Sequence, residues 1–226
     1  LPNNPSIRVM AMTAAQNALD DTRPAGVMYE PELTDATLPK AIVLRRPTGP
    51  ATAVYRLDAL QTLDGTNAGP TQVDVPGLPT VADAPWTINL WTYMDTPPNT
   101  RTLLAGFGDA TDTSGTQRYL GRITGGIHFW GGNVDIETGQ PFDVGKWQML
   151  TAVYDGATVS VYKNGEKLLS APADLNEAAP VVQIAPAGPW GGGDHRFAGK
   201  LQSVTIWNGA LNAAAIHALL AARPQG

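Results

Sequence analysis

The sequence predicts an all-β sandwich, and three observations support this prediction. Gly and Pro contribute 24 and 19 of the 226 residues, about 19% against an average near 12%, so the chain is rich in turns. Residues 86–93 alternate apolar and polar side chains with the period of two of a half-buried strand. The pairs Asp155-Gly156 and Asn164-Gly165 each separate two strand-like segments, as in β-hairpins.

The strand candidates recur every 8 to 12 residues or so, which is typical of a sandwich. A parallel α/β sheet would instead need a repeat of about 30 residues, and none is found. After the strands comes one short helix, capped by Asn212, with an apolar face of Ile216, Leu219 and Leu220. In order, the predicted strands are 54–57, 72–75, 86–93, 101–107, 119–123, 127–130, 147–154, 158–163, 166–170, 181–185 and 201–207.

The first fifty residues differ from the rest of the chain. Residues 10–21 are helix-like, whereas 26–29 and 41–44 are apolar pieces among five prolines that limit strand pairing. We expect residues 1–50 to be an N-terminal extension that packs on the main body, or a linker or tail from a neighbouring domain. Residues 51–226 are predicted to form the sandwich domain.

Charge and composition exclude several classes of function. The net charge is −5 and the sequence pI is about 5.1, without a basic run, so nucleic acid is not expected as a partner. No apolar stretch approaches the roughly 20 residues needed to cross a bilayer, so membrane insertion is not expected. The absence of cysteine excludes disulfides and thiolate chemistry.

Three stretches resemble the laminin-G-like, concanavalin A-like lectin/glucanase jelly-roll family, especially its bacterial secreted branch. They are Pro-Trp-Thr-Ile-Asn-Leu-Trp at 85–91, a Gly-Lys-Trp strand with its hairpin at 145–165, and the final strand and turn at 197–212. Their order and spacing match the family over about residues 52–222. The resemblance implies two antiparallel sheets, one concave and one convex. It also implies a secreted, cell-surface or periplasmic protein, usually one that binds glycans or proteins.

The resemblance also raises the question of calcium. Many family members hold a structural Ca²⁺ with two acidic residues where this chain has Gln202-Ser203, which are weaker ligands. The acidic loop 108–113 offers another site, in which Asp109 or Asp112 would bind Ca²⁺ together with backbone oxygens. Calcium is therefore a possible cofactor at Asp109 and Asp112, and the alternative is that these residues form a turn.

Two aromatic, glycine-rich segments are the best candidates for ligand binding. Trp130 precedes Gly131-Gly132-Asn133, and Trp190 precedes three glycines. An indole can stack on the apolar face of a sugar, while Asn, Asp and His bond its hydroxyls. The alternative is that Trp130 and Trp190 fill space beneath the loops. The other strand tryptophans, Trp86, Trp147 and Trp207, are predicted to be structural.

Polar residues beside these tryptophans complete the predicted site. His128 and His195 each lie among aromatic residues and glycines, and their loops are expected to meet at one rim of the sandwich or to be ordinary polar loops. Asp135 and Glu137 form the nearest pair of carboxylates, but no third acid follows as in glycosidases of related folds. A solvated rim is the favoured interpretation for this pair, which we place in the loop after Trp130.

The sequence thus predicts a non-catalytic binding module that recognises carbohydrate through rim-loop aromatics. The predicted ligand-binding residues are Trp130, His128, Asn133, Asp135, Trp190 and His195. The alternative is a structural or accessory subunit, or a domain of a larger extracellular assembly or glycan-active enzyme. In that case the N-terminal extension would dock on a neighbouring domain or subunit.

Overall fold

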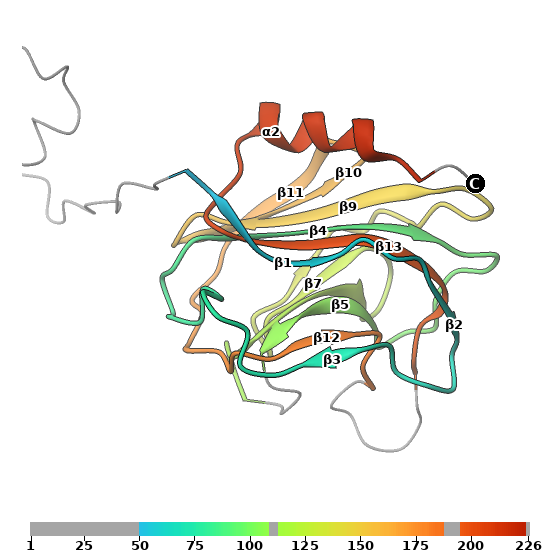
Figure 1. Ribbon diagram of the computed structural model, residues 1–226, viewed down its shortest axis with the longest axis horizontal. Helices are drawn as coiled ribbons and strands as arrows, with labels where there is room; N and C mark the ends of the chain where they lie inside the picture. The colour runs from blue at the N-terminus through green and yellow to red at the C-terminus, as the bar shows by residue number, and fades with distance from the viewer. Residues whose placement is uncertain (1–49, 109–112, 188–194, 225–226) are drawn as a thin grey trace, which may run out of the picture. The chain divides into compact units, whose positions relative to one another are not determined.

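A computed structural model describes residues 50–108, 113–187 and 195–224, and these belong to one compact unit. The predictions for the N-terminal fifty residues fall almost wholly outside the described part. The described residues build two antiparallel sheets packed face to face, with one short helix on the outside of the larger sheet (Figure 1). The predicted all-β jelly-roll sandwich is therefore confirmed.

The larger sheet has seven strands. Its main path runs in the order β1-β13-β4-β9-β10-β11, and β2 also pairs with β13. The long strand β13 thus lies between a strand from the start of the domain and one from its middle. The strands are β1 (Thr52–Leu57), β2 (Gln61–Asp64), β4 (Trp86–Tyr93), β9 (Gln148–Tyr154), β10 (Thr158–Lys163), β11 (Glu166–Pro172) and β13 (Ala198–Asn208).

The smaller sheet has six strands in the order β3-β12-β5-β6-β7-β8. Two strands of the sandwich, β2 and β8, are absent from the sequence prediction, and β8, with two residues, is too short to show an alternating pattern. The predicted strand 72–75 is also shorter in the structure, since Asp74 adopts a φ of 51°. The strands are β3 (Thr71–Gln72), β5 (Thr102–Gly108), β6 (Gln117–Arg122), β7 (His128–Trp130), β8 (Ile136–Glu137) and β12 (Val182–Ile184).

Trp86 joins the two sheets at the centre of the core. It is fully buried on β4, with its ring centroid 5.7 Å from that of Tyr154 in the same sheet. Across the sandwich, its centroid lies 6.1 Å from that of Phe107 and 5.4 Å from that of Phe129. These edge-on and stacked contacts are the arrangements that aromatic pairs favour. The predicted structural role of Trp86 is consistent with this position.

The hairpin turns follow the sequence signals closely. Asp155 accepts hydrogen bonds from the backbone N–H groups of Ala157 at 3.0 Å and Thr158 at 2.9 Å, which closes the β9–β10 turn. In the β10–β11 turn, Asn164 and Gly165 adopt φ values of 50° and 81°, as a type I′ turn requires. The Asn164 side chain also accepts a bond from the Met149 N–H at 2.8 Å.

Helix α2 (Ala213–Ala218), followed by the 3₁₀ turn η1 (Leu219–Ala222), covers the outer face of the seven-stranded sheet (Figure 1). Asn212 caps it by accepting from the Ala215 N–H at 2.9 Å, as predicted. Ile216 is fully buried against a small second core of Trp91, Met149, Val153 and Tyr162. Strand β4 is therefore buried on both faces, whereas its alternating pattern predicted a half-buried strand.

Candidate functional site

Four side chains on the outer face of the six-stranded sheet form the candidate site. Leu120 and Phe129 pack in the main core. Because successive side chains in a strand alternate, their neighbours Gln117, Tyr119, His128 and Trp130 lie on the opposite face. Tyr119 pairs directly with Trp130 across β6 and β7. We call these four side chains the aromatic face.

The aromatic rings of this face are fixed by specific contacts. The Trp130 indole N–H donates to the Gln117 side-chain oxygen. The Tyr119 hydroxyl donates to the Gly108 carbonyl at 3.0 Å. A Cβ at Gly106 would lie 2.6 Å from Tyr119 Cδ1, so the tyrosine ring lies over this glycine. Tyr119 and Trp130 are 0% and 3% exposed and pack with Leu103.

Several polar atoms of the aromatic face have no hydrogen-bond partner among the protein groups. They are the Gln117 Nε2 and both ring nitrogens of His128, all buried. The His128 Nε2 lies 3.5 Å from Asp135 Oδ1, which is an ion-pair distance only when the histidine is protonated. A buried polar group without a partner costs about 1–3 kcal/mol, so these atoms mark a place where ligand hydroxyls would be stabilised.

The rim of the aromatic face is acidic. Glu137 accepts hydrogen bonds from the Thr124 hydroxyl and the Gly125 N–H, and these bonds lower the pKa of its carboxyl. Asn133 is exposed in the turn between β7 and β8, with a φ of 59°. Asp135 lies in the predicted loop after Trp130, but the prediction was wrong for the next two residues, because Ile136 and Glu137 form β8 and pair with β7.

The structure brings only some of the predicted residues together. His128, Trp130 and Asp135 meet at the aromatic face, and Asn133 lies in the adjoining turn. His195 instead precedes β13 of the other sheet, and its buried Nδ1 has no hydrogen-bond partner. Trp190, Asp109 and Asp112 lie outside the described residues. The stacking role of the tryptophans and the calcium site therefore stay predictions.

The described part of the chain contains no cluster of metal-binding side chains. Within 50–108, 113–187 and 195–224, no three His, Asp or Glu side chains gather as a metal ion would require. Gln202 and Ser203 lie at a bulge where β13 pairs with β4, and Ser203 adopts a φ of 52°.

Among the described residues, no helix has the length and apolar character needed to cross a membrane.

A second group of residues was missed by the sequence analysis. Tyr93, Lys146, Trp147, Lys200 and Arg223 line one hollow on the seven-stranded sheet. The prediction of a strand at 147 was wrong by one residue, since β9 begins at Gln148, and Trp147 remains partly exposed beside Tyr93. No sequence signal links these positions, because they come from four separate segments.

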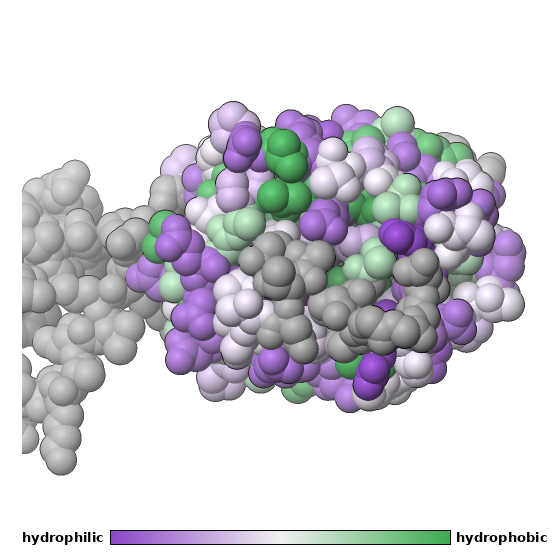
Figure 2. All heavy atoms as spheres, turned by 90° about the horizontal axis from the view of Figure 1, so that it is seen from below, coloured by the Kyte–Doolittle hydropathy of each residue, from purple (hydrophilic) through white to green (hydrophobic). Residues whose placement is uncertain are grey.

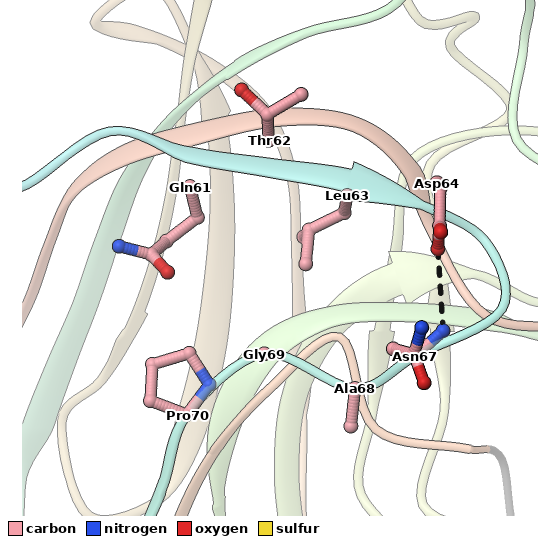
Figure 3. A pocket seen from close by; sticks show the side chains of 8 residues that line it. All are labelled: Gln61, Thr62, Leu63, Asp64, Asn67, Ala68, Gly69 and Pro70. Carbon is pink, nitrogen blue, oxygen red and sulfur yellow. Dashed lines mark hydrogen bonds between the residues drawn. The ribbon is translucent and has the colours of Figure 1, made fainter.

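Another hollow, of about 370 Å³, lies between β2 and the turn that follows it (Figure 3). Its carboxylate, Asp64, accepts bonds from the Thr66 hydroxyl at 2.7 Å, the Thr66 N–H at 2.8 Å and the Asn67 N–H at 3.3 Å. These bonds lower the pKa of Asp64 and hold the turn. No aromatic ring lines this hollow, so it is a weaker candidate for a sugar site.

Comparison with known proteins identifies the family. Residues 67–217 match the family described as the concanavalin A-like lectin/glucanases superfamily, Laminin_G_3. The chain belongs to this family. A comparison with the curated proteins finds no match.

Solved structures share the fold at low sequence identity. Domain 4 of AbnA, an extracellular arabinanase from Geobacillus stearothermophilus in complex with arabinotriose, is 20% identical, with a TM-score of 0.55 over 76% of this chain and 89% of that one. The CBM40 of Ruminococcus gnavus IT-sialidase, bound to α2,3 sialyllactose, is 10% identical, with a TM-score of 0.55 over 75% and 100%. The receptor binding domain of a botulinum neurotoxin C/D mosaic serotype is 11% identical, with a TM-score of 0.51 over 76% and 51%.

Proposed function

We propose that this lectin/glucanase-family domain is a non-catalytic carbohydrate-binding module, and that the aromatic face and its rim hold the glycan. The observation that carries the proposal is the set of unpartnered polar atoms on Gln117 and His128, next to the exposed rim residues Asn133 and Asp135. Sugars present many hydroxyls, which such polar groups can bond, while the buried Tyr119 and Trp130 rings hold these groups in place from within the sheet face. The bound sugars named for the arabinanase domain and the sialidase module support the same conclusion.

The proposal extends to the setting of the protein. The arabinanase neighbour is an extracellular enzyme, which supports a secreted, cell-surface or periplasmic location for this chain. Because that neighbour is one domain of a larger enzyme, an accessory domain of a glycan-active enzyme is the second candidate. Seen from the side of the six-stranded sheet, the described surface is mainly hydrophilic with scattered hydrophobic patches, which is ordinary for a protein surface (Figure 2).

A glycan-array screen of the full chain tests the proposal. Two rim variants keep the fold: Asn133→Gly suits the positive φ of this residue, and Asp135→Asn keeps the shape of the side chain. We expect each to weaken binding about tenfold, the loss of one good polar contact. Glu166→Gln, at an exposed position on β11 of the other sheet, is the matched control and should bind normally.

Two results would count against carbohydrate recognition at this face. One is a blank array, particularly if light scattering then shows a stable oligomer, which would favour the structural role. The other is glycan binding that neither rim variant weakens, which would move the ligand to a different face of the sandwich.

Calcium forms a separate part of the proposal, based on Asp109 and Asp112 in the segment after β5. Repeating the screen in EDTA, and measuring the melting temperature with and without Ca²⁺, tests this part. A calcium-dependent rise in melting temperature that Asp109→Asn with Asp112→Asn abolishes would support it. Identical melting with and without Ca²⁺ would exclude it.

A further inference from the structure

Two adjoining hollows on the seven-stranded sheet form a continuous groove. The larger, of about 540 Å³, is lined by Tyr93, Lys200 and Pro224, and the smaller, of about 340 Å³, by Trp91, Asn164 and Leu220. They adjoin because Lys146, Trp147 and Arg223 line both. We call this the basic groove. It lies beside η1, on the opposite side of the sandwich from the aromatic face.

The basic groove presents a pair of partly exposed aromatic rings. The centroids of Tyr93 and Trp147 are 5.9 Å apart, at an interplanar angle of 56°. Lys200 places its ammonium group 5.1 Å from the centroid of the Tyr93 ring. Both rings are only half-buried, so, unlike Tyr119 and Trp130 on the aromatic face, they are accessible to a ligand.

The groove carries an excess of positive charge. Asp143 is already paired with Lys163, whose Nζ lies 2.7 Å from it, and it is 3.6 Å from Lys146. Among the described residues, no carboxylate lies within ion-pair distance of Lys200 or Arg223. Asp95, which accepts from the Tyr93 hydroxyl at 3.3 Å, is the other acid nearby. Of the residues that the structure describes, Lys146, Lys200 and Arg223 thus line the groove together with one carboxylate, Asp143, and Asp95 lies nearby.

A buried hydrogen-bond donor adds an independent observation. Trp91 lines the smaller hollow and is 2% exposed, and its indole N–H has no acceptor. A buried N–H without a partner is rare in folded proteins. A ligand oxygen in this part of the groove would satisfy it.

We propose that the basic groove is a second saccharide subsite, which takes an anionic sugar. The Tyr93–Trp147 pair contacts the apolar face of the sugar ring, and Lys200 and Arg223 bind its carboxylate or sulfate. A long polyanion such as nucleic acid is disfavoured by the net charge of −5 of the whole chain. The ligand class rests on the proposed function, but the site is a different one.

The test uses titrations of the full chain with an oligogalacturonate, a sulfated oligosaccharide and a neutral oligosaccharide of equal length. We expect the anionic sugars to bind, more weakly as salt rises from about 0.05 to 0.5 M, and the neutral one not to bind at the groove. A comparison of the affinities for the oligogalacturonate and the sulfated oligosaccharide shows whether the groove prefers a carboxylate or a sulfate. NMR signals of the tryptophan indole N–H groups locate the binding site, because those of Trp91 and Trp147 should shift on binding, whereas that of Trp130 should not.

Matched variants make the test specific. Lys200→Ala and Arg223→Ala should each weaken binding of the anionic sugar about tenfold. Lys167→Ala is the control, since Lys167 lies 5.6 Å from the Tyr162 ring centroid in the same sheet but outside the groove. All three residues are exposed, so the variants should fold.

The outcomes separate this inference from the proposed function. Loss of anionic-sugar binding in Lys200→Ala, with normal binding in Asn133→Gly, supports the groove. Normal binding in Lys200→Ala with loss of binding in Asn133→Gly overturns the groove proposal and leaves the aromatic face as the site. Equal affinity of Lys200→Ala and Lys167→Ala for the anionic sugar overturns it as well. Binding of neutral glycans alone also overturns it. Failure to bind any glycan would overturn both proposals.

Discussion

The two outer faces of the sandwich both carry a tryptophan next to a tyrosine, but the pairs differ in exposure. On the six-stranded sheet, Trp130 and Tyr119 are almost wholly buried, and the indole N–H is bonded to Gln117. On the seven-stranded sheet, Trp147 and Tyr93 are half-exposed and surrounded by cations. The difference shows that glycines next to a tryptophan do not by themselves indicate an exposed ring, and that a strand-like context does not indicate a buried one.

Alanine substitution of the two tryptophans should give the largest difference between the faces. Trp130→Ala removes a fully packed indole and should lower the free energy of unfolding by about 3–5 kcal/mol. Trp147→Ala should cost about 1 kcal/mol, because its ring is already partly in water. Urea unfolding followed by circular dichroism measures both.

Equal losses of unfolding free energy in Trp130→Ala and Trp147→Ala would contradict the difference in burial between the two faces. A small loss for Trp130→Ala in particular would indicate that its ring is accessible and free to stack on a sugar. Trp130→Phe serves as the milder variant if the alanine form does not fold.

Glycines on the two faces provide a second, smaller contrast. A Cβ at Gly106 would lie 2.0 Å from the Arg118 carbonyl oxygen, so Gly106→Ala must displace backbone and should cost about 1–3 kcal/mol. A Cβ at Gly145, in the basic groove, would meet nothing within 4 Å. Gly145→Ala should therefore cost only the strain of its φ of 72°, about 1 kcal/mol. Thermal unfolding should show a larger drop in melting temperature for Gly106→Ala than for Gly145→Ala. The reverse order would contradict the tight packing of the six-stranded face.

The pH dependence of Asp143 should give the smallest effect. Burial acts to raise the pKa of Asp143, but the hydrogen bond and charge of Lys163 and the charge of Lys146 outweigh it, so the pKa is lowered. A carboxyl with a lowered folded-state pKa stabilises the protein above its unfolded pKa of about 3.9, and this stabilisation disappears as pH falls through the folded value. Asp143→Asn should thus cost up to about 1 kcal/mol at pH 7 and almost nothing near pH 2.

The unfolding free energy of Asp143→Asn at both pH values, compared with wild type, measures this effect. The same variant removes one of the two carboxylates near the basic groove, so its affinity for an anionic sugar should rise slightly. A loss of affinity would show that Asp143 contacts the ligand directly.

Local sequence patterns predicted most of the sandwich. The bounds of β4 were predicted correctly because its alternation spans eight residues, and the turns at Asp155 and Asn164 followed from their glycine pairs. Both signals are local, so no tertiary information is needed to interpret them. In contrast, β8 has two residues and is held by its pairing with β7, which local sequence does not encode.

The candidate sites were harder to predict, for a physical reason. Whether a side chain on the outside of a sheet is exposed depends on what packs over it, as Ile216 of helix α2 does over Trp91. The sequence identified His128, Trp130 and Asp135 as neighbours because they are close along the chain. It could not assemble the basic groove, whose residues at 91–93, 143–147, 164, 200 and 220–224 come from five separate segments.

The central position of β13 has a consequence for how the protein is made. This strand, residues 198–208, pairs with β1, β2 and β4, so the seven-stranded sheet cannot close until nearly the whole domain has left the ribosome. Until then β4 has a free edge that is rich in apolar side chains. Folding of this domain should therefore be slow, because it waits for contacts between residues distant in sequence, and β4 is prone to aggregate until residues 198–208 pair with it.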